Sequence, residues 1–590
     1  MEDVYSWAVS SLGNSSSTLN DYVSPIGVLV SVVASLLLNS PSDSPFAPPP
    51  NLPKFLESGN SSIAPPWSNR NTGDSGPQGV ANTGVTRYYD FVVARGVIAP
   101  DGVNKSSILV NNQYPGPLIE ANWGDYLEVT VHNNIFGPSE GTSMHWHGLP
   151  QNGTPWLACT ERRGITLICR PNTLRGSMDV GLTPYRSKLT KSKKVLAMVI
   201  YGPASSAYDF DIGPILISDY YHADYYKLVE NVVGNNTLTS LLAPSDNTLI
   251  HGLTNYACSL TSSDPPCTAG PALGKFKFST GKTHRLRLIN PSSSGSPIIF
   301  SIDNHTMTVI ANDFVPVAGQ RSDVLVTATG KPGDLYWIRA RQPDFCNFVL
   351  QPFGLAAIYY DGADRNQIPA STPPQNFLTP VLNNCDPLES TVPSYQITPD
   401  SSPDATLVLN MSLTVNSTGH TLYQMNAQSF RGDFNDPLLS VFSAKTPSSP
   451  LDSERNVYNF ARNESIRIIM NNNISFGHPM HLHGQQMFVL AVGTGTWDGK
   501  VVNPENPQRR DTQLVPAYGY LVIQLTGNNP GVWPLHCHIS WHLSAGMLVN
   551  LVLQPDELER MKVPEALEQT CKDWNAYTAG NAVDQIDSGS

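Results

Sequence analysis

The chain has 590 residues, a formal net charge of −12 and only 14% charged residues, together with 49 prolines and 44 glycines. This length exceeds what a single hydrophobic core usually holds, and many turn-forming residues with few charges favour short strands over long solvated helices. The acidic balance excludes a surface built to bind nucleic-acid phosphates, so we expect an all-β protein of several domains that does not bind nucleic acid.

The N-terminal region, residues 1–81, is expected to be a leader followed by a low-complexity segment. Residues 26–38 form the apolar run IGVLVSVVASLLL, which matches the core of a signal peptide better than a membrane span of about 20 residues. A buried segment and an uncleaved membrane anchor are the alternatives. The Pro- and Ser-rich sequence up to residue 80 is expected to be disordered or loosely packed.

The chain carries features of a secreted glycoprotein. It contains ten N-x-Ser/Thr sequons, among them Asn104, Asn304, Asn410, Asn416 and Asn463. We therefore expect an extracellular, monomeric protein, with membrane attachment only if the apolar run is retained as an anchor.

Three similar segments, each predicted to form a strand, recur along the rest of the chain. DYLEVTVHNN at 125–134, GKTHRLRLIN at 281–290 and NESIRIIMNN at 463–472 alternate apolar and polar residues and end in Asn. Alternation with a period of two predicts half-buried strands, and the recurrence predicts three β-domains of similar build. The expected boundaries are 82–205, 206–370, 371–560 with a Pro-rich linker at its start, and a tail at 561–590.

Eight of the fourteen histidines fall in the short motifs HWHG, HPMHLHG and HCHISWH. In an extended strand, residues i and i+2 share a face, so each His-x-His presents two imidazoles to one place. Two histidines, a cysteine and a distant methionine are the ligands of a blue-copper site, and Met547 follows Cys537 by ten residues. Zinc is the competing metal, but a mononuclear zinc hydrolase needs only about three ligands, and the chain has no HExxH motif. Eight histidines and a cysteine exceed what a single metal ion can use, so several metal ions are indicated.

The motifs HWHGLPQNGTPW, HPMHLHG, NPQRRDTQL and HCHISWHLSAGM together resemble those of multicopper oxidases, in particular the ascomycete laccase-like group. The resemblance covers residues 82–590 apart from one segment. It implies three cupredoxin-like Greek-key β-sandwich domains and four copper ions, one of type 1, one of type 2 and two of type 3. It also implies one-electron oxidation of phenolic (diphenol) substrates, coupled to four-electron reduction of O2 to water.

The resemblance also implies a ligand for each copper ion. Type 1 copper would be bound by His478, Cys537 and His542, with Met547 in the axial position. Type 2 copper would be bound by His145 and His481. The two type 3 ions would be bound by His147 with His538 and by His483 with His536. Asp219 in ISDYYH would accept the phenolic proton near type 1 copper, with a role in a turn or strand end as the alternative.

The order His536–Cys537–His538 has a physical consequence of its own. Neighbouring side chains of an extended segment face opposite ways, so one short peptide can contact two metal centres and carry electrons between them. Electrons would enter near His542, which is expected close to the surface. A thioether from Met547 would stabilise the oxidised metal, which predicts a low-to-middle type 1 potential.

Residues 157–196 depart from the family pattern. They contain nine Lys or Arg against two Asp or Glu, and no histidine occurs between His147 and His222, where the family has a W-Y-H-S-H motif. The family's acidic residue in W-x-D-G falls on Ala158. A reading-frame or splice-model error would produce such a bounded change. The alternative is a genuine variant in which each type 3 ion has two ligands instead of three and binds poorly.

Two other functions remain open. One is a copper-binding cupredoxin protein with an impaired cluster, acting as an electron carrier or a pseudoenzyme. The other is a ferroxidase, which is disfavoured because no apolar run of about 18 residues follows Met547.

Cysteine spacing and one charged turn give further expectations. Proximity predicts the disulfides Cys258–Cys267 and Cys346–Cys385, and the family resemblance implies Cys169–Cys571. Arg509, Arg510 and Asp511 are expected to form an ion-paired structural turn.

Overall fold

The structure is a computed structural model whose described residues all lie in one compact unit, Pro48–Ser590. For residues 165–169 and 176–183 it describes only the course of the backbone. The described residues are 52–56, 65–67, 69–71, 81–136, 143–156, 165–169, 176–183, 194–234, 243–260, 266–268, 273–295, 297–312, 318–343, 349–370, 388, 391–433, 435–443 and 451–579. The apolar run at 26–38 therefore lies outside them.

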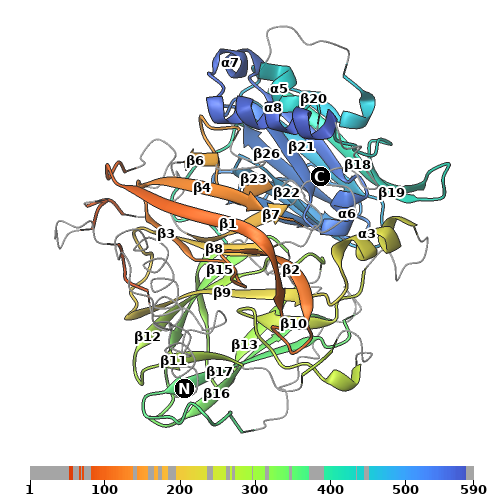
Figure 1. Cartoon of the computed structure of the whole chain (residues 1–590). Coiled ribbons are helices and arrows are strands. Elements are labelled where there is room, and N and C mark those ends of the chain that lie inside the picture. The colour runs from red at the N-terminus through yellow and green to blue at the C-terminus, as the bar shows by residue number, and fades with distance from the viewer. Residues whose placement is uncertain are drawn as a thin grey trace, which may run out of the picture. The chain divides into compact units, whose positions relative to one another are not determined.

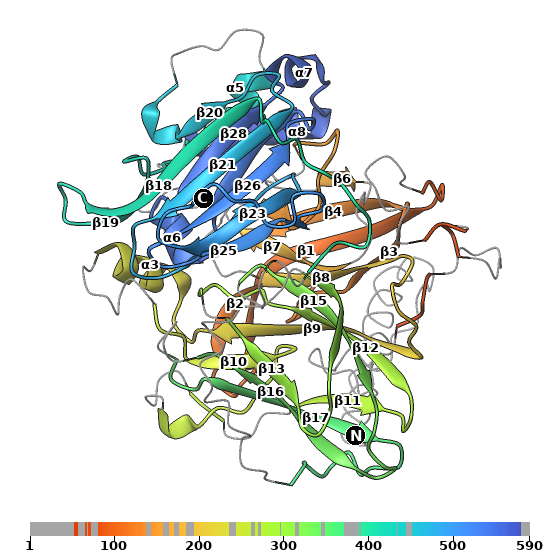
Figure 2. The ribbon, with the colours of Figure 1, turned by 180° about the vertical axis from the view of Figure 1, so that it is seen from behind.

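The described chain folds into six sheets, which we group in chain order into three sandwiches (Figures 1 and 2). The first sandwich has one sheet in the order β2 (Lys105–Val110), β1 (Thr86–Ile98), β4 (Tyr126–Asn134), β6 (Ile165–Cys169). Its other sheet runs β3 (Ile119–Asn122), β8 (Lys194–Tyr201), β7 (Gly176–Thr183), β5 (Ser143–Trp146).

The second sandwich consists of a five-stranded and a four-stranded sheet. The first of these is ordered β10 (Asn247–Ile250), β9 (Phe210–Tyr220), β12 (Thr283–Ile289), β15 (Arg321–Thr327), β14 (Thr308–Asn312). The other is ordered β11 (Gly274–Phe278), β17 (Phe353–Tyr360), β16 (Leu335–Arg341), β13 (Ile299–Ile302). Helix α3 (Tyr225–Gly234) and the short helix η2 (Cys258–Leu260) lie in its connections.

The third sandwich carries most of the clustered histidines. One sheet is ordered β19 (Thr421–Met425), β18 (Ala405–Val415), β21 (Ser465–Asn472), β26 (Gly519–Thr526), β23 (Met487–Thr494), β24 (Gln508–Arg510). The other is ordered β20 (Val457–Asn459), β28 (Leu548–Leu553), β27 (Gly531–Cys537), β22 (His478–Leu482), β25 (Thr512–Val515). Its helices are α5 (Leu438–Ser443), η5 (Ser453–Arg455), α6 (Ser540–Ser544), α7 (Pro555–Arg560) and α8 (Glu565–Ala579).

The three recurring segments of the sequence form strands in equivalent positions of the three sandwiches. β4, β12 and β21 each pair in parallel with an earlier strand, namely β1, β9 and β18. Each also pairs antiparallel with a later strand, namely β6, β15 and β26. The expectation of an all-β protein made of β-sandwiches is therefore confirmed.

One of these strands is more buried than its alternating sequence predicts. In β12 the polar positions Arg285 and Arg287 are also buried. Arg287 forms a bidentate pair with Asp211, at 3.1 and 2.7 Å to Oδ2, and Arg285 pairs with Asp323. Buried carboxylates thus offset the desolvation of the guanidinium groups, which the strand pattern alone could not show.

The expectation of loose packing before residue 80 is wrong for the described part of that segment. The N–H of Leu52 donates to the carbonyl of Asp211 at 2.6 Å, and Trp67 is only 7% exposed within the core of the first sandwich. Asn122 exchanges two hydrogen bonds with the backbone of Leu56, at 2.8 and 2.9 Å. Isolated apolar side chains in a Pro-rich segment therefore suffice to dock it.

A helix from the connections of the second sandwich packs into the hydrophobic core of the third. Tyr225, Val229 and Val232 of α3 pack into the same buried cluster as Met411 of β18 and Leu551 of β28. Within the described part of the chain, none of the helices combines the length and hydropathy needed to cross a membrane. The packing of α3 ties the second sandwich to the one that carries most of the histidines.

Candidate metal centre

His478, Cys537 and His542 form a compact group, which we call the Cys–His triad. His478 begins β22, Cys537 ends β27 and His542 lies on α6. The Nδ1 atoms of the two histidines are 3.0 Å apart, and the sulfur of Cys537 lies 3.7 Å from His478 Nδ1 and 3.5 Å from His542 Nδ1. All three side chains are buried. Three potential metal ligands therefore converge on one point.

The chain returns to the triad after α6 through backbone hydrogen bonds. The N–H of Met547 donates to the carbonyl of His542 at 3.0 Å, and the N–H of Cys537 donates to the carbonyl of Met547 at 3.1 Å. The Met547 side chain is completely buried in the same core cluster as Cys537. The helical turn thus fixes His542 and Met547 relative to the cysteine.

The triad fits a copper ion. Metal bonds of about 2.0 Å to nitrogen and about 2.3 Å to sulfur would give the observed separations at ligand–metal–ligand angles of roughly 100° to 120°. Burial lowers the pKa of His478 to about 3. Burial, with a smaller contribution from His478, also holds the pKa of His542 well below its usual value. Both imidazoles are therefore neutral and can donate a lone pair.

His542 lies deeper than the sequence predicts. It was expected near the surface, but it is only 1% exposed. The ring of Tyr423 stacks on it with centroids 4.3 Å apart, and Phe476 lies at 5.5 Å. Because Phe476 is half-buried, this aromatic ring separates His542 from solvent.

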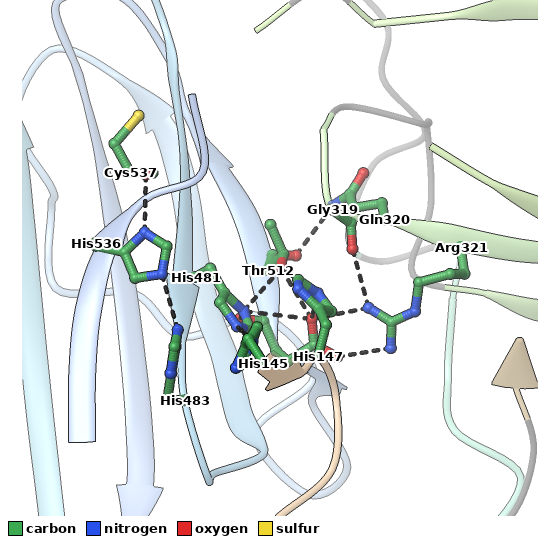
Figure 3. Close-up of polar contacts among 11 residues, drawn as sticks. His145, His147, Gly319, Gln320, Arg321, His481, His483, Thr512, His536 and Cys537 are labelled. Carbon is green, nitrogen blue, oxygen red and sulfur yellow. Dashed lines mark hydrogen bonds and ion pairs between the residues drawn. The ribbon is translucent and has the colours of Figure 1, made fainter. Parts of the chain in front are cut away.

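Six histidines form a second group, which we call the six-histidine cluster; Figure 3 labels all of them except His538. They come from the first and third sandwiches: His145, His147, His481, His483, His536 and His538. His145 Nε2 lies 3.2 Å from His481 Nε2, and His483 Nε2 lies 2.9 Å from His536 Nε2. The rings of His147 and His538 have centroids 5.0 Å apart. The two nitrogen pairs are spaced as two ligands of one metal ion would be.

Hydrogen bonds fix the orientation of several of these rings. His481 Nδ1 donates to the carbonyl of Asp511 at 2.9 Å, and His536 Nδ1 donates to the carbonyl of Cys537 at 2.8 Å. The Nε2 atoms of both rings therefore carry the lone pair that faces the cluster. His147 is oriented the other way, because its Nε2 donates to Asp511 Oδ1 at 2.9 Å. This hydrogen bond fixes the plane of the His147 ring beside the cluster.

Burial favours the neutral form of three histidines of the cluster, His145, His481 and His483. Burial, assisted by His147, lowers the pKa of His481 to about 4. Burial also holds the pKa values of His145 and His483 well below normal, with neighbouring histidines adding to the effect. Crowded imidazoles that resist protonation are suited to share metal ions and unsuited to act as acids.

Asp511 is a site residue that the sequence did not identify. The expected ion-paired turn is wrong: Arg510 contacts Gln513, Arg509 donates to Asn506 Oδ1 at 3.0 Å, and Asp511 pairs with Arg321 of the second sandwich. Burial would raise the pKa of Asp511, but the charge of Arg321 and the hydrogen bonds from His147 and His481 outweigh it and hold that pKa well below its usual value. The motif NPQRRDTQL contains Asp511, but its partner Arg321 lies 190 residues away in the sequence, so the motif alone did not reveal the pair.

Asp219 stabilises a turn beside α6. Its carboxylate accepts hydrogen bonds from the N–H groups of Ser293, at 3.0 Å, and Ser294, at 2.6 Å. The hydroxyl of Tyr221 donates to it at 3.3 Å. The carbonyl of Ser293 in turn accepts the N–H of Ser540 at 3.0 Å, at the start of α6. In the structure, therefore, Asp219 makes the contacts expected for its alternative role, in which it stabilises a turn.

Of the three predicted disulfides, one has both side chains among the described residues. A disulfide joins Cys258 and Cys267, the pair that the short loop between them suggested. Cys346 and Cys385 lie outside the described residues, as does the side chain of Cys169, so its pairing with Cys571 stays a prediction.

Strand β7 occupies the divergent segment next to the six-histidine cluster. It pairs antiparallel with β5, and Gly181 lies opposite His145. β7 contains no histidine. Residues 157–164, 170–175 and 184–193 lie outside the described part of the chain.

A Cys–His triad beside a six-histidine cluster, on paired β-sheets, defines a copper-binding β-sandwich protein. Three family models described as multicopper oxidase match residues 92–161, 211–363 and 414–557. The chain belongs to the multicopper oxidase family.

Comparison with individual proteins indicates which members of the family the chain resembles. The chain is 33% identical to Laccase-2 of Podospora anserina, over 86% of each chain. It is 33% identical to Laccase-1 of Melanocarpus albomyces, over 86% of this chain and 85% of that protein. The crystal structure of the laccase from Botrytis aclada matches 90% of this chain and 100% of its own with a TM-score of 0.77 and 29% identity. The chain is a copper oxidoreductase of the laccase type with cupredoxin-like sandwiches, and the comparisons favour this over a ferroxidase or an inactive copper protein.

Proposed function

We propose that this protein oxidises diphenols by single electrons at the Cys–His triad and uses the electrons to reduce O2 to water at the six-histidine cluster. The observation that carries the proposal is the adjacency of Cys537 and His536. The sulfur of Cys537 belongs to the triad, and Nε2 of His536 lies in the cluster. A covalent path of one peptide bond therefore links the two groups.

The ring orientations support one distribution of copper ions. Nε2 of His145 faces Nε2 of His481, which suits type 2 copper, and Nε2 of His483 faces Nε2 of His536, which suits one type 3 ion. His147 and His538, whose rings have centroids 5.0 Å apart, would hold the other type 3 ion. His478, Cys537 and His542 would hold type 1 copper, and the thioether of Met547, buried in the same core cluster, would be the further donor.

When bound, copper would supply the one-electron acceptor at the triad and the electron donor to O2 at the cluster. The protein's own residues keep both places dry and neutral. Phe476 and Tyr423 cover His542, so a phenol would dock against this aromatic edge and not against the metal. The three sandwiches would correspond to domains at 82–205, 206–370 and 371–560.

We propose that Asp219 assists by accepting the phenolic proton. Asp219 is 7% exposed, and its carboxylate binds the N–H groups of Ser293 and Ser294 in the turn that contacts the start of α6. Replacing Asp219 by Asn should shift the pH profile for phenols and leave the profile for ferrocyanide, which releases no proton, unchanged. Equal effects on both donors would assign Asp219 to the turn alone.

We further propose secretion and N-glycosylation. Asn104, Asn304, Asn410 and Asn416 are exposed. At Asn416 the hydroxyl of Thr418 donates to the amide oxygen at 2.8 Å. A mass decrease after treatment with an N-glycosidase, on protein recovered from the culture medium, tests both points.

Oxygen uptake with hydroquinone and with Fe(II) tests the function. The copper-loaded protein should consume O2 faster with the diphenol, and Cys537→Ser should abolish uptake. Faster uptake with Fe(II) would indicate a ferroxidase. Intact type 1 absorption without uptake would indicate an electron carrier.

A further inference from the structure

The second sandwich contributes no residue to the triad or to the six-histidine cluster, yet one of its loops reaches the cluster (Figure 3). The loop consists of Gly319, Gln320 and Arg321, immediately before and at the start of β15. The N–H of Gly319 donates to the carbonyl of Asn290 at 2.8 Å, and the N–H of Asn290 donates to the carbonyl of Gln320 at 3.0 Å. We propose that this loop, which we call the clamp, is a positioning element that holds the ligands of the trinuclear copper cluster.

Arg321 forms the central contact of the clamp. Its Nη1 and Nη2 donate to the two carboxylate oxygens of Asp511 at 2.9 and 2.7 Å, and both side chains are buried. The same Oδ1 accepts from His147 Nε2 at 2.9 Å. A bidentate guanidinium fixes the plane of a carboxylate, so Arg321 sets the direction in which Asp511 holds the His147 ring.

The other two residues act on the remaining side of the cluster. Gln320 Nε2 donates to the carbonyl of Thr512 at 3.0 Å, and the Thr512 hydroxyl lies 3.1 Å from His481 Nδ1. Gly319 has φ +90°, and a Cβ atom there would lie 2.9 Å from the His538 ring. The backbone of Gly319 therefore forms a wall against His538, and a side chain would displace that ligand.

The clamp links three parts of the chain through ligands that rest on the proposed distribution of copper. Residues that orient metal-bound histidines typically change metal affinity by about 10- to 100-fold when they are replaced. We therefore expect Arg321→Ala and Gly319→Ala to weaken copper binding at the cluster by that amount. The type 1 absorption should stay at the wild-type level, because the clamp does not contact the triad.

Copper per chain, the type 2 paramagnetic resonance signal and the type 3 near-ultraviolet absorption are the measurements. Two variants serve as matched controls. Arg339 forms the same kind of buried bidentate pair with Asp303, at 2.8 and 2.9 Å, within the second sandwich. Gly333 has φ +91° with open space around its Cβ direction. Arg339→Ala and Gly333→Ala should keep the type 2 and type 3 signals, and Arg321→Lys should restore only part of them, since lysine cannot bind both oxygens in a plane.

Equal losses of cluster copper in Arg321→Ala and Arg339→Ala, or full signals in Arg321→Ala, would overturn the clamp. Failure of the proposed function would show in the wild type itself, which would then hold a single, type 1 copper. In that case the copper-free protein provides the test. The clamp predicts that Arg321→Ala, but not Arg339→Ala, shifts the imidazole NMR signals of His147, and unchanged signals in Arg321→Ala contradict it.

Discussion

The proposed path of the electrons depends most on two residues that are neighbours in the sequence. His536 and Cys537 are adjacent, and in the structure they face different groups of ligands. This could be predicted because alternation along an extended chain follows from backbone geometry alone. The partnership of Asp511 with Arg321 could not be predicted, because it depends on how two sandwiches pack. The burial of His542 was missed because the rings beside it come from distant parts of the third sandwich, Tyr423 from β19 and Phe476 from the loop before β22.

Met547 offers a prediction at this scale. Its buried side chain and its backbone bonds to Cys537 and His542 favour an axial role at the triad. Met547→Leu removes the thioether that stabilises the oxidised metal, so the type 1 potential should rise. A redox titration of the visible absorption measures this. An unchanged potential would place the sulfur away from the metal.

At the scale of single elements, β12 shows the limit of pattern reasoning. Its alternation predicted a half-buried strand, but both faces are covered, and Arg287 lies between Asp211 and Asp323. Strand type and position were predictable from the recurring segment, whereas the second buried face requires knowledge of the neighbouring sandwich.

Removing Arg287 from this network of buried ion pairs should strongly lower the free energy of unfolding. Arg287→Ala leaves two buried carboxylates without their shared partner, so we expect a loss of about 3–5 kcal/mol in the free energy of unfolding. Chemical denaturation of the copper-free protein measures it. A loss below about 1 kcal/mol would show that water replaces the guanidinium group.

The same strand carries a pH-sensitive group. Burial lowers the pKa of His284, stacked on Phe278 with centroids 4.2 Å apart, to about 4. The unfolded chain, with a histidine pKa of about 6.5, then binds more protons than the fold between pH 6.5 and 4. Stability is complete above about pH 6.5 and falls as the pH drops towards 4. In unfolding curves recorded across this range, His284→Phe should reduce the decline, and an identical decline would exclude His284 as its source.

At the scale of the whole molecule, the three β-sandwiches, the two ligand groups and copper were all predictable, since they rest on local motifs. The docking of Leu52 and Trp67 was not, because isolated apolar residues give no periodic signal. The family resemblance also implies a second His-x-His in the first domain that this chain lacks, so the distribution of copper proposed above gives each type 3 ion two histidines.

The central claim is that the triad and the six-histidine cluster form one electron path ending in water. The most direct test is the ratio of diphenol electrons consumed to O2 consumed by the copper-loaded protein, with hydrogen peroxide assayed in parallel. The account predicts four electrons for each O2, no peroxide, and loss of all uptake in Cys537→Ser. Two electrons for each O2 with accumulating peroxide, or uptake that persists in Cys537→Ser, would contradict it.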